Sequence, residues 1–302
     1  MNTKRIPLIT LVALAVLAGC SSAPKRPPEI FTNRNAAMGQ LDLGNRTVSK
    51  GDYASAHLFL QEAWRMAVST DDPETRIRVR LAEGNAWFNE GKLDLSDNAW
   101  TTALAEATEA KNKMLISTCK IYLARGTLAE GTNRESLPAE ERQQRARDAK
   151  AVALSEMGNV KANPLYSAFG WKVIGLSEKE LGNWADAEKA LKEAATIHEK
   201  DRYLEDAAYD WYLIASVRSK AAQYPSAINA LQTAIAFDRR GENSNGLGMN
   251  WMAIGTIEEK AGNRDLALAA YQRSADIFRS AFLPVNAAEA DQKAAALMTN
   301  TR

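Results

Sequence analysis

The sequence predicts an all-α protein, a solenoid of about six helix pairs that repeat about every 40 residues and end in a C-terminal capping helix. Trp171, Trp211 and Trp251 are spaced by 40 and 40 residues. Turn-like sequences follow the first and the third of them eleven residues later, at Gly182 and Gly262. No stretch alternates apolar and polar residues with a period of two, so we expect no sheet. Self-similarity at one fixed period is typical of stacked repeat units.

The first element is a secretory signal over residues 1–19. Lys4 and Arg5 form a basic start, and residues 6–18 are apolar apart from Pro7 and Thr10. An apolar run of about 13 residues is too short to span a bilayer, but it fits the core of a signal peptide.

The signal ends in Leu17-Ala18-Gly19-Cys20, which resembles the lipobox of bacterial lipoproteins. The resemblance implies cleavage before Cys20, a diacylglycerol on its thiol and an acyl chain such as palmitate on its amine. No other cofactor is expected. Several acyl chains anchor a protein more firmly than one, because each buried methylene contributes about 0.8 kcal/mol. Ser21 stands where inner-membrane lipoproteins carry Asp, which implies the outer membrane, on its periplasmic face or alternatively at the cell surface.

Residues 20–32 predict a tether between the lipid and the folded body. Three prolines fall in the nine residues after Cys20. Such a segment is extended and semi-rigid, and at about 3.1 Å per residue it reaches roughly 28 Å. Lys25 and Arg26 either contact anionic head groups or stay solvated. Two charges attract a membrane only weakly, so the solvated tether is favoured.

The solenoid is expected over residues 33–282. Small residues recur seven positions before each turn, and they let two helices approach closely. Glycines in the turns suit the left-handed conformation that ends a helix. Prolines begin several expected helices, where a missing N–H has no intrahelical partner to lose. The small residues are Gly44, Gly84, Ala124, Gly175, Ala215 and Gly255, and the prolines are Pro73, Pro138, Pro164 and Pro284.

One copy of the repeat is traced by Trp171, Ile174, Gly175, Gly182, Trp184, Ala187, Leu191 and Ala194. This pattern resembles the tetratricopeptide repeat family, and degenerate copies in register extend the resemblance over nearly all of the mature chain. The resemblance implies antiparallel helix pairs in a right-handed superhelix, with the first helix of each pair lining a concave groove. The period of 40 instead of the common 34 adds about 9 Å of helix per pair.

The spacing is interrupted once. The turn expected at Gly131 is followed by the next only at Gly182, 51 residues later instead of 40. The eleven inserted residues and the polar region 131–142 predict an extended loop or a lengthened helix, and a tolerated surface insertion is favoured over a recruiting site. Residues 283–302 then predict the capping helix and tail, because the exposed end of a solenoid must be covered.

Composition and motifs exclude several function classes. The 38 Lys and Arg against 37 Asp and Glu, a net charge of +1, lack the basic excess of a nucleic-acid binder. Two cysteines and two histidines exclude a disulfide scaffold and a Cys/His zinc cluster. No phosphate-binding loop, nucleophile elbow or HExxH motif is present. We predict no enzyme and no metal site, with His57 and His198 as exposed helix residues and Cys119 as a small buried hydrophobe.

Mapping the family's groove positions onto the expected first helices gives nine candidate partner-binding residues. They are Asn45, Asn85, Phe88, Arg125, Lys172, Tyr209, Tyr212, Met249 and Met252. Such a mixture of aromatic, Met, Asn and Arg side chains is common at interfaces, and it implies a protein or peptide partner. We expect an outer-membrane lipoprotein that acts as a scaffold or adaptor in cell-envelope assembly, in the β-barrel, pilus or secretin, or peptidoglycan machinery. The alternative is a ligand- or substrate-binding component that serves a transporter.

Overall fold

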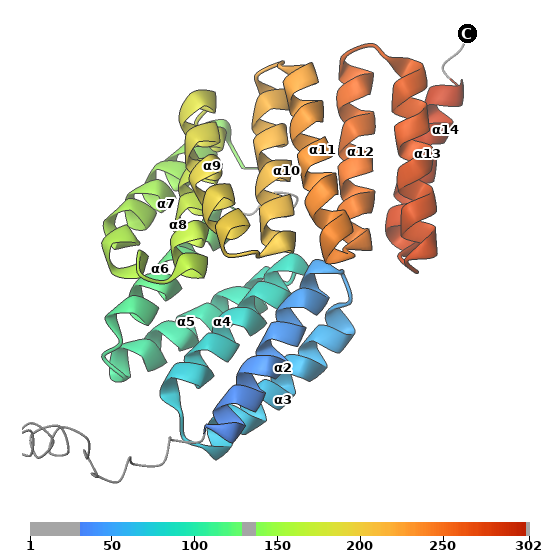
Figure 1. Cartoon of the computed structure of the whole chain (residues 1–302). Coiled ribbons are helices and arrows are strands. Elements are labelled where there is room, and N and C mark those ends of the chain that lie inside the picture. The colour runs from blue at the N-terminus through green and yellow to red at the C-terminus, as the bar shows by residue number, and fades with distance from the viewer. Residues whose placement is uncertain (1–30, 129–136, 300–302) are drawn as a thin grey trace, which may run out of the picture. The chain divides into compact units, whose positions relative to one another are not determined.

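A computed structural model describes residues 31–128 and 137–299, and this part of the chain is a succession of α-helices with no strand (Figure 1). The helices are α2 (Thr32–Ser49), α3 (Tyr53–Ser69), α4 (Pro73–Asn89), α5 (Leu93–Glu109), α6 (Lys113–Thr127), α7 (Ala139–Val160), α8 (Pro164–Glu180), α9 (Trp184–Lys200), α10 (Leu204–Lys220), α11 (Tyr224–Gly241), α12 (Ser244–Lys260), α13 (Arg264–Ser280) and α14 (Pro284–Thr299). They form six consecutive pairs, α2–α3 to α12–α13, in the first of which Leu60 of α3 packs against Gly44 of α2, and α14 packs on α13. The predicted all-α solenoid with a C-terminal capping helix is confirmed.

The turns within most pairs contain a glycine in the left-handed conformation. The φ angle is +78° at Gly51, +83° at Gly91, +80° at Gly182 and +83° at Gly262. A residue in this conformation satisfies the last carbonyls of a helix, and glycine adopts it without a Cβ penalty. The fifth pair carries Ala222 at the equivalent position, with φ of +59°. Regular 17-residue helices and three-residue turns therefore set the period of 40.

Small residues of the first helices accept large side chains of the second helices. A Cβ added at Gly84 would lie 2.3 Å from Nε1 of Trp100, and one at Gly175 would lie 2.6 Å from Cγ of Leu191. Trp100 is buried, and its ring N–H donates to the carbonyl of Leu81 at 3.2 Å. The close helix approach predicted from the small residues is confirmed at these positions.

The first helices line the inner side of the array. Successive first helices contact one another, as α4 does α6, α6 does α8 and α10 does α12. Among the described helices, successive second helices make no contact of comparable extent. The array therefore curves with its first helices inside.

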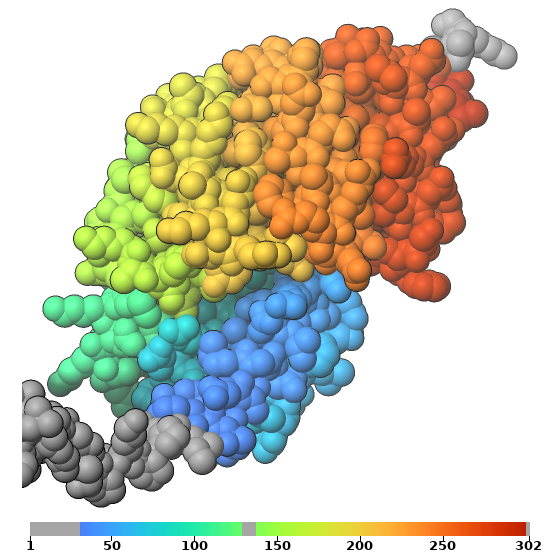
Figure 2. All heavy atoms as spheres, viewed as in Figure 1, coloured from blue at the N-terminus to red at the C-terminus, as the bar shows by residue number. Residues whose placement is uncertain are grey.

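The curvature brings the first pair against the sixth. The Asn245 side chain at the start of α12 donates to the backbone carbonyl of Ser49 at the end of α2, at 3.1 Å. A Cβ added at Gly51 would lie 3.5 Å from the Asn245 amide and 3.7 Å from Cδ2 of Leu283. Figures 1 and 2 show the tip of α2 and α3 beneath the ends of the C-terminal helices.

The third pair departs from the regular lengths. Helix α6 has 15 residues and α7 has 22, where most helices have 17. The predicted lengthening of a helix at the insertion is confirmed for α7. Cys20, the signal and tether residues 20–30 lie outside the described residues. Within the described helices, none is both long and apolar enough to cross a membrane.

Candidate partner-binding groove

The nine residues predicted to bind a partner all lie on first helices. Asn45 is on α2, Arg125 on α6 and Lys172 on α8. Asn85 and Phe88 are on α4, Tyr209 and Tyr212 on α10, and Met249 and Met252 on α12. Asn45, Tyr209 and Met249 are exposed, most of the others are half-buried, and Lys172 is buried. The structure brings five of them together in two clusters, Phe88 with Arg125 and Lys172 with Tyr209 and Tyr212, and the other four belong to neither cluster.

The first cluster joins Phe88 and Arg125. The Arg125 guanidinium lies over the Phe88 ring, 4.7 Å from its centroid. The centroid of the Phe88 ring in turn lies 5.7 Å from that of buried Trp100, and this contact holds the Phe88 ring in place. The Nη1 atom of Arg125 is buried, and no atom of the described chain accepts a hydrogen bond from it. A buried guanidinium donor without an acceptor is costly, so the half-buried Arg125 side chain gains a hydrogen bond if it turns outward to an anionic or carbonyl group.

Aromatic rings continue this cluster toward α8. Tyr122 stacks on Phe169 with centroids 4.1 Å apart and planes 21° apart, and it also contacts Trp100 at 5.4 Å. Burial raises the pKa of Tyr122, with the charge of Asp206 adding to the rise. Tyr122 was not among the residues predicted from the family's groove positions, which on this helix marked Arg125.

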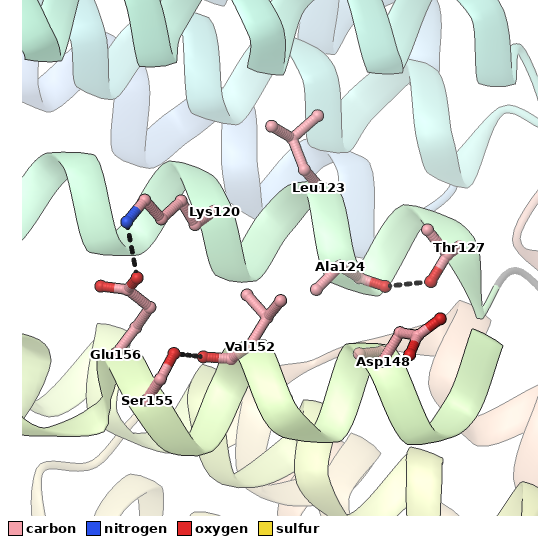
Figure 3. Close-up of a pocket in the computed structure, with 9 residues that line it drawn as sticks. Lys120, Leu123, Ala124, Thr127, Asp148, Val152, Ser155 and Glu156 are labelled. Atoms are coloured by element: carbon pink, nitrogen blue, oxygen red, sulfur yellow. Dashed lines mark hydrogen bonds and ion pairs between the residues drawn. The ribbon is translucent and has the colours of Figure 1, made fainter. Parts of the chain in front are cut away.

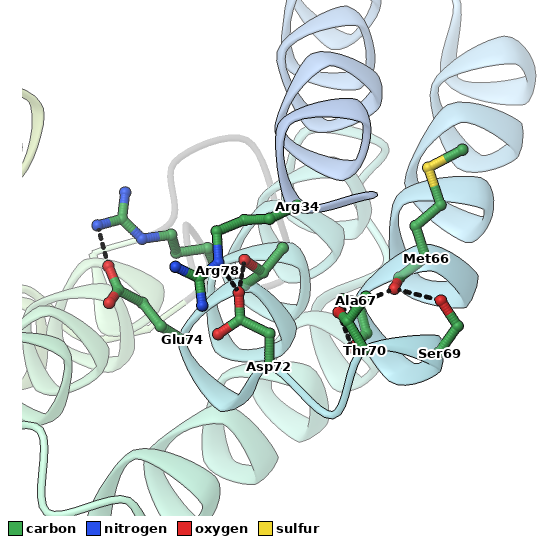
Figure 4. Close-up of polar contacts among 9 residues, drawn as sticks. Arg34, Met66, Ala67, Ser69, Thr70, Asp72, Glu74 and Arg78 are labelled. Carbon is green, nitrogen blue, oxygen red and sulfur yellow. Dashed lines mark hydrogen bonds and ion pairs between the residues drawn. The ribbon is translucent and has the colours of Figure 1, made fainter. Parts of the chain in front are cut away.

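The start of α4 places another cation near these rings. Arg34 of α2 and Thr75 both donate to the Asp72 carboxylate at 2.6 Å, which fixes the first turn of α4 (Figure 4). Burial opposes ionisation of Asp72, but hydrogen bonds from Thr75 and Arg34 lower its pKa overall. One turn later Arg78 pairs with Glu74 at 2.6 Å and lies 5.8 Å from the Tyr166 ring centroid. Unlike Arg125, Arg78 already has a carboxylate partner.

The second cluster is built around a buried lysine. Lys172 Nζ lies 3.1 Å from Asp210 and 3.9 Å from Asp206, and it sits 5.2 Å from the centroid of the Tyr209 ring. Burial lowers the pKa of Lys172, but the charges of Asp210 and Asp206 outweigh it and raise the pKa overall. Lys172 is therefore a cation that serves the internal packing of α8 on α10, and the charge available to a partner is small.

Tyr209 and Tyr212 form the exposed face of this cluster. Their rings are nearly parallel, with an interplanar angle of 11° and centroids 6.0 Å apart. Tyr209 is 40% exposed, and Met249 of the next first helix is 36% exposed. Stacked aromatic rings offer a large apolar surface to a partner, and the flexible methionine on the next first helix can adapt to an irregular partner surface.

Both histidines differ from the prediction that they are exposed. His198 is buried, and its Nδ1 lies 2.6 Å from Oδ2 of Asp210. The acceptor comes from the next first helix, twelve residues on, which sequence spacing alone did not reveal. His57 is half-buried, its ring centroid lies 3.7 Å from that of Trp87 with the planes tilted by 31°, and its Nε2 lies 3.1 Å from Glu90. Each histidine thus bonds two helices together.

The described residues hold no group of three or more side chains suited to a metal ion. Cys119 is buried, as predicted, and burial raises the pKa of its thiol to about 12. A thiol with such a pKa carries almost no thiolate at neutral pH and is a poor nucleophile.

Comparison with known proteins supports the fold. No protein-family model and no curated protein matches the sequence. A Rap protein in complex with Competence and Sporulation Factor is similar, with a TM-score of 0.54 over 89% of this chain and 76% of that chain, at 14% identity. The apo form of RapI is similar with a TM-score of 0.54 over 86% and 70% of the two chains, at 10% identity. At these identities the likeness shows the fold alone, which is a tetratricopeptide-repeat-like solenoid.

Proposed function

We propose that the protein is an outer-membrane lipoprotein, anchored through Cys20, whose solenoid binds a protein or peptide partner in the periplasm. It acts as a scaffold or adaptor in cell-envelope assembly and catalyses no reaction. The anchor rests on the lipobox-like residues 17–20, and binding rests on the inner face of the first helices. The similar fold of the Rap protein that binds Competence and Sporulation Factor supports a partner-binding role.

The observation that carries the binding proposal is the unsatisfied Nη1 of Arg125 over the Phe88 ring. A buried donor that makes no hydrogen bond destabilises the folded protein by about 1–3 kcal/mol, and by more when the group is charged. Nη1 is closed to solvent, so a carboxylate or carbonyl of the partner would accept from it once the half-buried Arg125 side chain turns outward. Tyr209, Tyr212 and Met249 would then hold apolar side chains of the same partner further along the inner face.

The binding proposal is tested by photocrosslinking in the native envelope. A photoreactive residue replaces Tyr209, and the matched control replaces Leu58, which is 66% exposed on second helix α3. We expect a defined protein adduct from position 209 and none from 58. Arg125→Glu with Tyr212→Ala should reduce the adduct about tenfold, a loss of roughly 1.4 kcal/mol, while helical circular dichroism stays unchanged. Equal adducts at both positions, or an adduct indifferent to the double variant, would refute the groove.

The lipid anchor has a separate test. Labelled fatty acid should enter the wild-type protein and not Cys20→Ala, and the wild type should fractionate with the outer membrane. Cys119→Ala is the matched control, because its buried thiol should not accept a lipid. Equal labelling of wild type and Cys20→Ala would remove the anchor from the proposal while leaving the groove in place.

The identity of the crosslinked partner then decides the envelope process. A β-barrel assembly factor, a pilus or secretin subunit and a peptidoglycan enzyme are the three expected classes. Purification of the adduct followed by peptide sequencing distinguishes them directly.

A further inference from the structure

A groove between α6 and α7 is independent of the inner face described above. Its cavity measures about 480 Å³ (Figure 3). Leu123 and Ala124 of α6 and Ala149 and Val152 of α7 supply its apolar lining. At one end Lys120 of α6 pairs with Glu156 of α7 at 2.7 Å, and at the other end Asp148 of α7 lies beside Thr127.

The groove faces away from Arg125. Successive residues of a helix are rotated by about 100°, so Leu123 and Thr127 project roughly opposite to Arg125 on α6. The candidate inner-face residues of α6 and the groove residues therefore form two separate surfaces. A partner on one of them does not occupy the other.

The other copies of the repeat show what is missing from this groove. In them, a small residue of the first helix is covered by a large side chain sixteen residues later on the second helix. The pairs are Gly44 with Leu60, Gly84 with Trp100, Gly175 with Leu191 and Gly255 with Tyr271. All four large side chains are buried. The large residue acts as a knob that fills the space above the small one.

The third copy lacks this knob. Ala124 is its small residue, 51 positions before Gly175, yet Ala124 lines an open cavity. The largest apolar side chain that α7 contributes to the lining is Val152. A second large residue is also absent, because Lys120 stands where the later copies carry Trp171, Trp211 and Trp251. The insertion before α7 has changed its register, and an apolar notch remains.

The charges at the two ends of the groove are unequal. Glu156 is neutralised by Lys120 and also accepts a hydrogen bond from Ser117 at 2.6 Å. Asp148 is exposed, and among the described residues it accepts a hydrogen bond only from the neutral Gln144 amide, at 2.9 Å. The open end of the groove is therefore anionic and complements a basic side chain.

We infer that the α6–α7 groove is a second docking surface, which accepts a helix of a partner protein. The helix inserts a leucine or aromatic side chain above Ala124 and places a lysine or arginine beside Asp148. An amphipathic helix in an apolar groove is anchored by residues three or four apart, and a 480 Å³ cavity admits such a pair. The chain itself provides the precedent in four of its other copies.

The test uses a helix of this chain as the probe. A fluorescent synthetic peptide of Trp184–Lys200 carries Leu191, which fills the notch above Gly175, and an Ala195→Lys change places a lysine four residues later on the same face. Anisotropy is measured with the full mature chain, and methyl resonances of Leu123 and Val152 locate the site. We expect submillimolar binding, with a Kd below about 1 mM, and at least about tenfold weaker binding of the Leu191→Ala peptide.

Two protein variants test whether the peptide binds in the α6–α7 groove. Val152→Trp fills the notch from within, and Asp148→Lys reverses the exposed charge without touching the core. Each should weaken binding of the peptide that carries Leu191 by about tenfold or more. Leu154→Ala, at an exposed position of α7 outside the lining, should leave that binding unchanged. Arg125→Glu should also leave it unchanged, which separates this surface from the proposed inner groove.

Three results would overturn the inference. They are no binding up to about 1 mM peptide, binding that ignores both Val152→Trp and Asp148→Lys, and shifts confined to inner-face residues. If the chain associates with itself and Val152→Trp abolishes that association, the occupant of the groove is a second copy of the chain and not a helix of a partner protein. Circular dichroism checks that the Val152→Trp protein is folded. If it is not, Asp148→Lys alone tests the groove.

Discussion

Asp238 on α11 shows how far one buried residue can depart from its ordinary behaviour. Its carboxyl is 1% exposed and accepts hydrogen bonds from Asn243 at 2.8 Å and from Asn250 at 2.7 Å. Burial raises its pKa to about 7, Glu205 adds to the rise, and the two amides oppose it. The Oδ1 atom of Asn250 is buried and has no hydrogen-bond donor in the described chain.

The raised pKa of Asp238 predicts a stability that falls as pH rises. The folded protein holds a proton that the unfolded chain, with its pKa near 3.8, releases earlier. The contribution is complete below pH 3.8 and is lost as the pH approaches about 7, to a total of at most about 4 kcal/mol. Asp238→Asn removes the titration and supplies an N–H that Asn250 Oδ1 can accept after an amide rotation.

Urea unfolding from pH 4 to 8 checks this prediction. Asp238→Asn should be more stable than the wild type at pH 8 by about 2–4 kcal/mol, and its stability should vary less with pH. Asp186→Asn, at an exposed position of α9, serves as the control. Parallel pH profiles for wild type and Asp238→Asn would contradict the assignment.

At the scale of the helix pair, the small residue and its knob were predictable from sequence because both recur at a fixed spacing. The turn glycines and the helix-starting prolines were predictable for the same reason. The bond between His198 and Asp210 was not, because it joins two copies and its residue types do not recur. The equivalent positions hold Asp238 and Asn250 in the next copy.

The same lack of recurrence explains the mixed result for the predicted groove. Family spacing placed Lys172 on an inner helix correctly, but Asp210 on α10, the next first helix, pairs with it, and Lys172 is buried. Whether a side chain at an inner position is available to a partner therefore depends on the residue that packs against it from the next copy of the repeat. Tyr122 and the α6–α7 notch were missed because they arise where the copies differ.

Gly84 predicts a large effect from one added methyl group. Gly84→Ala should destabilise the fold by about 1–3 kcal/mol, because its Cβ would overlap the buried Trp100 ring. Gly158→Ala is the matched control on α7, where a Cβ meets nothing within 4 Å. That variant should gain about 0.5–1 kcal/mol from helix propensity.

Chemical denaturation followed by circular dichroism measures both glycine variants. Opposite signs of the change are the expected result. A Gly84→Ala protein as stable as Gly158→Ala would show that Trp100 can move aside and that the close approach is not required.

At the scale of the whole solenoid, the contact between its first and sixth pairs stands apart from the rest of the fold. Most packing joins neighbours in sequence, as expected for stacked repeats. The Asn245 bond to Ser49 spans 196 residues. One such hydrogen bond contributes about 0.5–1.5 kcal/mol, so the contact is strong enough to bias the curvature and weak enough to open.

Removing the Asn245 side chain should loosen this contact. Spin labels at exposed positions Lys50 and Ser244 report the separation of the two pairs in a chain that begins at Ser21. Asn245→Ala should increase the population of longer distances by about two- to tenfold, because one hydrogen bond is lost. Asn229→Ala on the exposed side of α11 is the control. An unchanged distance distribution would show that packing of Leu283 beside Gly51 holds the pairs together without the Asn245 bond.

The same contact has a consequence for how this chain can change over generations. Repeat arrays ordinarily gain or lose a unit by duplication or deletion at little cost, because each unit depends only on its neighbours. Here the turn after α2 meets Asn245 and Leu283 only when the intervening units are complete. Deleting or duplicating one unit would shift the sixth pair away from the first. A change in the number of units would therefore remove the contact between the first and sixth pairs, whereas a point substitution elsewhere in the array leaves it in place.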